Sequence, residues 1–433
     1  MSDDTEHRGQ RGRRSSRSSK HRHKHRQRVK VRVRSKKKPR QSKRPLLQSL
    51  VFGLAVVAIV AVIFAVNQTP QSVGSRSNAP AQLESGLPEL PPNRWVKIGV
   101  PYTVAWNRQR HSGAAYDTHR KKYFVFGSNT HGENWDNSVH EFDPLILRWS
   151  DHYTSDRRRS YRADEEGRPI AGSNGVRPWA MHTHDNLVYD PQLDALVVMA
   201  APLHNPAARA VSGIKQHPTW IYELKKREWR ALDTPDGGAP FGFGGASAHD
   251  SDRDIILSYS QKGLWELGPD RQHWLQVSDE FHHENYHSMV YDPMHKNFLV
   301  MGGQDEDCAV WVYVPGPDVG EQGSWEKREP GGDACSPDQH VPLAFDVHNG
   351  VALAVFDNPL PEGEIVTGTS STFVYDPKAN TYQKLPEGGL PRVGMNYTLV
   401  YDPANRVFYM LQGGRKDPPA VWALHLELLD FES

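Results

Sequence analysis

The sequence predicts an all-β body, a ring of six four-stranded antiparallel sheets, preceded by a basic tail and one membrane-spanning helix. Three observations carry this prediction. A Tyr, Phe or His followed by Asp recurs six times, each time before a turn and an apolar run. These pairs are 42 to 73 residues apart, which brackets the period of repeated four-stranded units. An uncharged apolar run at 46–66 follows a strongly basic segment.

The charge of the chain is divided unevenly between tail and body. The chain has 52 Lys and Arg and 51 Asp and Glu, yet residues 1–44 contain 19 basic and three acidic residues. The rest is therefore acidic, with 33 basic and 48 acidic residues. Residues 1–45 have too little apolar surface for a core, so we expect a disordered basic tail. It would contact anionic lipid headgroups, and nucleic-acid binding is the less favoured alternative.

Residues 46–66 are predicted to form a transmembrane helix. The run has 21 residues without a charge, which as a helix spans about 31 Å, the thickness of a bilayer core. Basic residues precede the run and few follow it, so the positive-inside rule places the tail in the cytoplasm and residues 67–433 in the periplasm or outside the cell. A cleaved signal peptide is less favoured because the run is longer than such peptides use.

The body after the helix divides into a spacer and a repeat domain. Residues 67–93 are rich in Pro, Ser, Gln and Asn, and we expect a flexible linker there. Residues 94–433 contain the repeats. The six recurring pairs are Tyr116-Asp117, Tyr189-Asp190, His249-Asp250, Tyr291-Asp292, Phe345-Asp346 and Tyr401-Asp402.

Each repeat is predicted to supply four strands in the same order. The first strand ends at the recurring pair, whose Asp accepts hydrogen bonds in the following tight turn. A second strand rich in β-branched and aromatic residues follows, as in "NFLVMGG". A third strand reads "VWVYVPG" or similar, and a fourth carries a Trp or Tyr, as in "SWEKRE".

The two ends of the domain are predicted to share one sheet. The sixth repeat lacks a clear fourth strand, whereas "RWVKIG" at 94–99 has that pattern and no repeat of its own. A strand at 94–99 that completes the last sheet closes the ring and protects its edges, which gives a six-bladed β-propeller. The polar, glycine-rich stretch 155–178 is interpreted as an insertion and not as a seventh unit.

The pattern "YDP…GG…VWVYVP…SWEK" resembles kelch-type propellers, including the central domain of galactose oxidase, over about residues 94–430. The resemblance implies a kelch-like fold and leaves function open, because propellers host many activities. Only Gly302-Gly303 and Gly413-Gly414 retain the double glycine after the second strand.

Polar residues at the start of each first strand are the candidate site. In a propeller these strands line the central channel, so their starts, and the loops after the second strands, gather at one mouth. Histidines His182 and His204 also stand on this side. The predicted ligand-binding residues are His111, His131, Trp135, His184, Tyr286, His287, His340, Asn396 and Tyr397.

Converging histidines admit two interpretations. Neutral imidazoles bind Zn, Cu or Fe, and they transfer protons near pH 7. Alternatively, each satisfies backbone groups at a strand start. From the sequence alone we assign no metal, no cofactor and no catalytic residue. Cys308 and Cys335, the two cysteines, either pair in an oxidising compartment or remain thiols.

Three functions compete, and the first is preferred. The first is a binding module for a glycan, peptide or partner protein, with Trp135, Trp179 and Tyr286 as stacking surfaces. The other two, which are taken up below, are enzymatic.

The second function is a polysaccharide lyase, in which His or Tyr abstracts a proton beside a carboxylate that Arg neutralises. Its candidates are His184, Tyr286 and His287, with Arg110 or Arg177. The third is a metal-dependent oxidase, since Tyr286-His287-Ser288 resembles the Tyr-His-Ser segment that carries copper ligands in galactose oxidase. That family also needs a cysteine crosslinked to a tyrosine, and neither cysteine here stands at a matching position.

Overall fold

The computed structural model describes residues 87–99, 111–131, 135–173, 176–232, 242–283, 285–303, 307–360, 368–412 and 419–428. The basic tail, the apolar run at 46–66 and most of the predicted linker lie outside these ranges, so the predictions for them stay predictions. Among the described residues, no helix has the length and apolar character needed to cross a membrane.

The first three sheets of the described chain each contain four antiparallel strands. Sheet 1 consists of β2 (Gly113–Asp117), β3 (Lys122–Phe126), β4 (His140–Asp143) and β5 (Arg148–Asp151). Sheet 2 consists of β9 (Leu187–Asp190), β10 (Ala195–Val198), β11 (Thr219–Glu223) and β12 (Glu228–Leu232). Sheet 3 consists of β13 (Ala246–Asp250), β14 (Ile255–Ser260), β15 (Gly263–Leu267) and β16 (Trp274–Ser278).

The next three sheets follow the same plan. Sheet 4 consists of β17 (His287–Asp292), β18 (Asn297–Gly302), β19 (Val310–Val314) and β20 (Ser324–Arg328). Sheet 5 consists of β22 (Leu343–Asp346), β23 (Val351–Asp357), β24 (Ser370–Asp376) and β25 (Thr381–Lys384), with the two-residue β21 (Gly331–Gly332) added in parallel to β25. Sheet 6 consists of β26 (Leu399–Asp402), β27 (Val407–Gln412), β28 (Ala420–His425) and β1 (Val96–Gly99).

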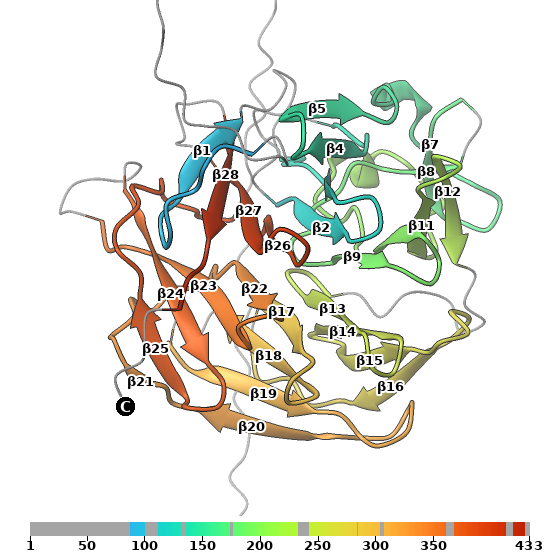
Figure 1. Ribbon diagram of the computed structural model, residues 1–433. Helices are drawn as coiled ribbons and strands as arrows, with labels where there is room; N and C mark the ends of the chain where they lie inside the picture. Colours follow the sequence, from blue (N-terminus) through green and yellow to red (C-terminus); the bar gives the residue numbers. More distant parts are fainter. Residues whose placement is uncertain are drawn as a thin grey trace, which may run out of the picture. The chain divides into compact units, whose positions relative to one another are not determined.

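A hydrophobic core fills each junction between neighbouring sheets. Phe124 of sheet 1 packs with Trp220 of sheet 2, and four further cores join sheets 2 to 6 in order. Tyr123 and Val421 belong to the last core, which joins sheet 6 back to sheet 1. The innermost strands β2, β9, β13, β17, β22 and β26 contact one another in the same cyclic order (Figure 1). This closed cycle of six sheets is consistent with a β-propeller.

The predicted closure of the last sheet is confirmed. Strand β1 pairs antiparallel with β28, so residues 96–99 supply the fourth strand of sheet 6. Residues 87–93, assigned to the linker by sequence, also contact this sheet: Leu87 is buried, and the backbone N–H of Asn93 donates to the carbonyl of His425 at 2.9 Å.

The recurring Asp explains why the repeat is so regular at its turns. In all six repeats one Asp oxygen accepts the backbone N–H groups two and three residues later. The carboxylate is at most 1% exposed in every case. The Asp side chain thus accepts the backbone N–H groups of the turn that follows it, as the sequence predicted.

The predicted insertion forms a small sheet of its own. Its strands are β6 (Arg162–Ala163), β7 (Pro169–Ala171) and β8 (Arg177–Pro178), preceded by the 3-10 turn η2 (Arg158–Ser160). A second 3-10 turn, η3 (Pro206–Arg209), follows β10. The insertion has a separate aromatic core that includes Tyr161 and Trp179.

Candidate functional site

A cavity of about 300 Å³ lies where the six innermost strands meet. Residues of β2, β9, β13, β17, β22 and β26 all line it, and most are small or apolar, such as Ala114, Ala248 and Leu343. This cavity extends to the turn end of the strands, where Ser251, Pro293 and Val347 line it, and the rings described next lie at the opposite end, where the strands begin.

Each of the six segments that lead into an innermost strand contributes an imidazole or aromatic ring to this end, and two loops after second strands add another. We call this group the mouth cluster. Its members are His111, His131, His182, His184, His204, Phe243, Tyr286, His340 and Tyr397.

His184 lies at the centre of the mouth cluster. Its ring centroid is 5.3 Å from His111, 5.7 Å from Tyr286 and 5.3 Å from Tyr397. On the far side Tyr286 contacts His340 at 4.9 Å. Residues that are up to 286 positions apart in sequence, His111 and Tyr397, thus both contact one imidazole.

The ring of His182 connects the centre to the rim. It stacks on His111 at 4.1 Å with an interplanar angle of 7°, and on His204 at 5.1 Å on its other side. His131, which is exposed, contacts both His182 and His204. Five histidines therefore form one contiguous group above sheets 1 and 2.

The backbone is strained where the cluster begins. The φ angles are 59° at His111, 47° at His184 and 76° at Tyr286, in the left-handed region that side-chain-bearing residues rarely occupy. Hydrogen bonds hold it there: the His111 carbonyl accepts from the Thr183 N–H at 2.8 Å. A Cβ on Gly113 would lie 2.5 Å from the His184 carbonyl, so only glycine fits beside it. Such enforced strain is typical of functional sites.

Several ring nitrogens of the cluster are buried without a hydrogen-bond partner. These are both nitrogens of His184, Nδ1 of His182 and Nε2 of His340. The three residues are only 2%, 5% and 7% exposed. Each unsatisfied buried polar atom costs about 1–3 kcal/mol, so the arrangement is expensive unless something binds there.

Burial keeps these imidazoles uncharged. Desolvation lowers the pKa of His182 to about 2, the pKa of His340 to about 4, and the pKa of His184 well below its usual value. The same cause raises the pKa of Tyr286 and of Tyr397. At neutral pH the cluster therefore presents neutral imidazoles, which can coordinate metal or accept a proton, beside protonated phenols that can donate one.

Two carboxyl groups lie close to the cluster. Burial raises the pKa of Asp185 well above its usual value, and burial together with Asp357 raises the pKa of Asp338 to about 6. The N–H of Met289 donates to Asp185, and the N–H of His340 donates to Asp338. These contacts assign both groups to bracing the strand starts.

Three of the predicted binding residues lie away from the mouth cluster. Nε2 of His287 is 3.2 Å from the Tyr259 carbonyl, inside sheets 3 and 4. The Asn396 amide donates to the Leu411 carbonyl at 2.6 Å, which makes it a brace of sheet 6. Trp135 lies between β3 and β4 and packs against the insertion core, with Arg158 4.3 Å above its ring. The predicted stacking residue Trp179 is fully buried.

The other six predicted residues, His111, His131, His184, Tyr286, His340 and Tyr397, belong to the cluster. The prediction left out His182, His204 and Phe243. The two histidines were visible in "HTH" and "PLHNP" on the correct side of the repeat. Phe243 lies in "GFGG", and no signal in that glycine run separates a site residue from a simple turn.

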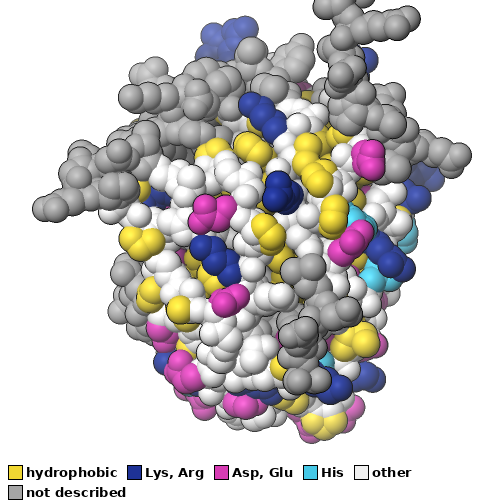
Figure 2. Space-filling view, turned by 60° about the vertical axis from the view of Figure 1, so that its left-hand side comes forward, with side chains coloured by type: hydrophobic (Ala, Val, Ile, Leu, Met, Phe, Trp, Pro, Cys, Tyr) yellow, Lys and Arg dark blue, Asp and Glu magenta, His cyan; other side chains and the backbone are white. Residues whose placement is uncertain are grey.

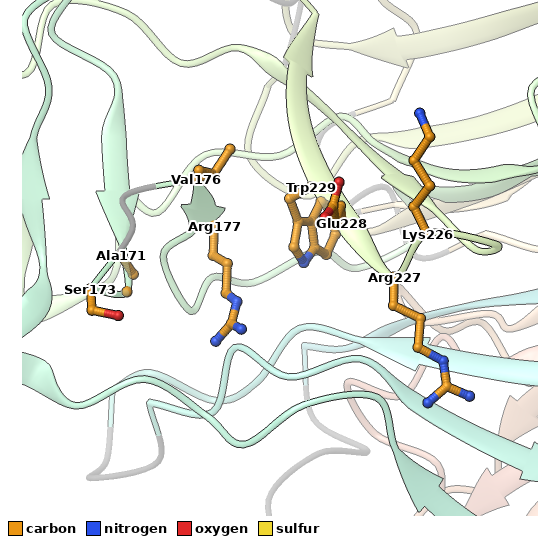
Figure 3. Close-up of a pocket in the computed structure, with 9 residues that line it drawn as sticks. Ala171, Ser173, Val176, Arg177, Lys226, Arg227, Glu228 and Trp229 are labelled. Atoms are coloured by element: carbon orange, nitrogen blue, oxygen red, sulfur yellow. The ribbon is translucent and has the colours of Figure 1, made fainter.

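A larger pocket, of about 440 Å³, lies elsewhere, between the insertion and the β11–β12 turn. Figure 3 shows Arg177 on the insertion side, Lys226 and Arg227 on the turn, and Trp229 between them. Arg177 is already paired with Asp156 at 3.3 Å, and the Trp229 N–H donates to Tyr153. We favour the mouth cluster as the site because buried ring nitrogens of His182, His184 and His340 lack partners.

The surface adds no competing patch on the face that Figure 2 shows. Basic and acidic side chains alternate there with scattered hydrophobic ones, and little histidine is visible.

The two cysteines form the disulfide Cys308–Cys335, which joins the loop after β18 to the segment before β22. The chain has no other cysteine. A cysteine–tyrosine crosslink of the galactose oxidase kind is therefore not available while this bond is intact.

Comparisons with known proteins do not identify the chain. No protein-family model matches it, and no curated protein matches it at a significant level of sequence similarity.

Proposed function

We propose that this chain is a single-pass membrane protein whose six-bladed, kelch-like propeller lies outside the cytoplasm and binds a ligand at its channel mouth. The observation that carries the proposal is the mouth cluster itself. Six separate strand starts supply its rings, and several of its buried nitrogens have no partner within the described protein.

The membrane part of the proposal rests on the sequence. The uncharged run of 21 residues is long enough to span a membrane, and the basic tail before it is typical of a membrane helix whose N-terminus lies in the cytoplasm. The disulfide supports an oxidising compartment for the body, because such bonds are uncommon in the cytosol.

A glycan is the ligand class that the rings favour, ahead of a peptide or a protein. Tyr286 and Phe243 are half-buried, so part of each ring is open to a ligand. Aromatic faces of this kind pack on apolar surfaces while a polar tip remains available for hydrogen bonding. Neutral imidazoles beside them can both donate to and accept from sugar hydroxyls.

The test is a screen of the full chain in nanodiscs against glycan and peptide arrays. Tyr286→Ala removes a ring from the mouth cluster, and we expect the affinity for any hit to fall at least about tenfold. Trp135→Ala removes a ring from the insertion core and serves as the control, with unchanged affinity once folding is verified. Equal losses in the two variants, or no binding to any array, would contradict the proposal.

A polysaccharide lyase is the second candidate, favoured by the neutral His184 ring beside two protonated phenols. His184 would take the proton at C5 of a uronate, a C4–C5 double bond would form, the C4–O bond would break, and Tyr286 would protonate the leaving oxygen. Of the predicted arginines, Arg177 lies at the insertion and Arg110 is outside the described residues; Arg392, which is near His340 and paired with Asp357 at 2.7 Å, is the candidate on the mouth side. Ultraviolet absorbance of the unsaturated product tests this.

A further inference from the structure

We propose that His111, His182 and His184 form a binding site for one divalent transition-metal ion of the kind that imidazole favours, with Zn²⁺ as its representative. These three buried residues each offer a ring nitrogen, and the nitrogens all lie within 4.8 Å of one another. This site goes beyond ligand capture at the mouth, since it can hold metal whether or not a glycan binds.

The separation of the nitrogens is close to what coordination needs. In a tetrahedral site with bonds of about 2.1 Å, ligand nitrogens are about 3.4 Å apart. Coordination also requires the rings to reorient, because His111 and His182 stack nearly parallel at 4.1 Å and a metal ion binds in the plane of each imidazole. The backbones of His111 and His184 are already held by hydrogen bonds that join sheets 1 and 2, so only side chains have to move.

The local environment lacks the partners that a merely structural histidine would have. Both nitrogens of His184 are buried and unpartnered. On His182, Nδ1 is unpartnered, and the Thr130 N–H approaches Nε2 at only 3.4 Å, the outer limit of a hydrogen bond. Neither His182 nor His184 pairs with a carboxylate among the described residues. Coordination would satisfy nitrogens that the fold leaves unsatisfied.

There is space for an ion next to the trio. A cavity of about 10 Å³, about the space of one water molecule or ion, is lined by His182, His184 and Phe243 but not by His111. Three imidazoles without a fourth ligand among the described residues are the donor set of zinc sites that keep one position open. The chemistry excludes Mg²⁺ and Ca²⁺, which prefer oxygen ligands.

The basic tail is a source of false binding that the experiment must remove. It contains His7, His21, His23 and His25. The starting protein is therefore the full chain in detergent with these four histidines replaced by Asn, stripped of metal with a chelator. Titration with Zn²⁺ is followed by calorimetry, and the melting temperature is recorded with and without the ion.

We expect one Zn²⁺ per chain, with a rise in melting temperature, and no such response to Mg²⁺. His182→Ala and His184→Ala should each lower the Zn²⁺ affinity by about 100-fold or more. Loss of a metal ligand reduces affinity more than loss of a residue that only hydrogen-bonds to a ligand, which already costs about 10–100-fold. His340→Ala is the matched control, a buried mouth histidine outside the trio, and should change the affinity less than about threefold. Equal affinity in all three variants would overturn the proposal.

A second readout needs no variant and so does not depend on their folding. Cu²⁺ bound to the same starting protein should show, by electron paramagnetic resonance, coupling to three imidazole nitrogens. Fewer than two coupled nitrogens, or no binding of Zn²⁺ or Cu²⁺ to folded protein, would overturn the site. Because no glycan or peptide is present, this failure would leave ligand capture at the mouth untouched.

Discussion

The two ends of the innermost strands follow opposite rules. At the turn end, each repeat places a buried Asp whose oxygens are satisfied by the turn's own N–H groups and by a nearby side chain. At the mouth, three of these strands are preceded by residues in the left-handed conformation, and buried ring nitrogens of His182, His184 and His340 have no hydrogen-bond partner in the described protein. The turn end, which is nearly the same in every repeat, therefore stabilises the fold, and the strand starts, which differ between repeats, form the candidate site.

The largest effect on stability is expected at the turn end, from Arg271→Met. Arg271 is 3% exposed and joins Asp190 of sheet 2 to Asp254 of sheet 3. Its loss leaves a buried charge unpaired, which lowers the free energy of unfolding by about 3–5 kcal/mol. Lys226→Met, which removes an exposed partner of Glu223, should cost less than about 1 kcal/mol. Urea denaturation measures the free energy of unfolding of both variants, and equal decreases would contradict the difference expected between a buried and an exposed ion pair.

The disulfide on the mouth side is expected to contribute to the stability of the fold. It closes a segment of 27 residues, so its removal in the double variant Cys308→Ser/Cys335→Ser should lower the free energy of unfolding by about 3–4 kcal/mol. The same loss should appear in the native chain under reducing conditions. A double variant as stable as the native chain would show that this bond contributes nothing to the mouth.

A smaller difference is expected between two copies of the same turn. Asp346 is buried, accepts two backbone N–H groups and also receives the Tyr401 hydroxyl at 2.6 Å. Asp346→Ala should lower the free energy of unfolding by about 2–3 kcal/mol. Asp376 forms the same turn on the third strand of its sheet, where it is half-buried. Asp376→Ala should cost about 1 kcal/mol, and the reverse order would contradict the account.

The sequence predicted the turn end almost completely because each repeat has an Asp at the same position before its turn. The hydrogen bonds of this Asp, as at Asp117 and Asp402, are made with the backbone of the same turn, so they could be predicted without knowing how the sheets pack. Ring closure was also predictable, since the sixth repeat lacked a strand that 94–99 could supply.

The mouth was only partly predictable because its contacts join different repeats. His287 and Tyr286 are neighbours in sequence, yet the left-handed turn at Tyr286 sends Tyr286 to the cluster and His287 toward Tyr259. His182 stands outside the position that the repeat emphasises, and its stacking on His111 depends on how sheets 1 and 2 pack. Strand periodicity does not carry that information.

The smallest effect concerns pH, where two mouth groups oppose each other. The folded-state pKa of His340 is lowered from 6.5 to about 4, so its contribution to stability is lost as the pH falls from 6.5 to 4. The folded-state pKa of Asp338 is raised from 3.8 to about 6, so its contribution is lost as the pH rises from 4 to 6. In the native chain the two nearly cancel.

Single variants separate them. Relative to the native chain, His340→Gln should make stability rise less, or fall more, as the pH increases from 4 to 6. Asp338→Asn should change the pH dependence in the opposite direction, each by on the order of 2 kcal/mol. Denaturation of the native chain and both variants at pH 4, 5 and 6 measures these differences, and differences of the same sign would contradict the proposed environment of these groups.

The proposed zinc site depends on the packing of sheet 1 against sheet 2, which brings His111, His182 and His184 together. Diffraction from crystals of the chain grown with Zn²⁺, recorded on both sides of the zinc absorption edge, tests it most directly. The account predicts a single strong anomalous peak bounded by these three imidazoles at the channel mouth. Three histidines directed to separate places, or zinc bound only at surface residues, would contradict it.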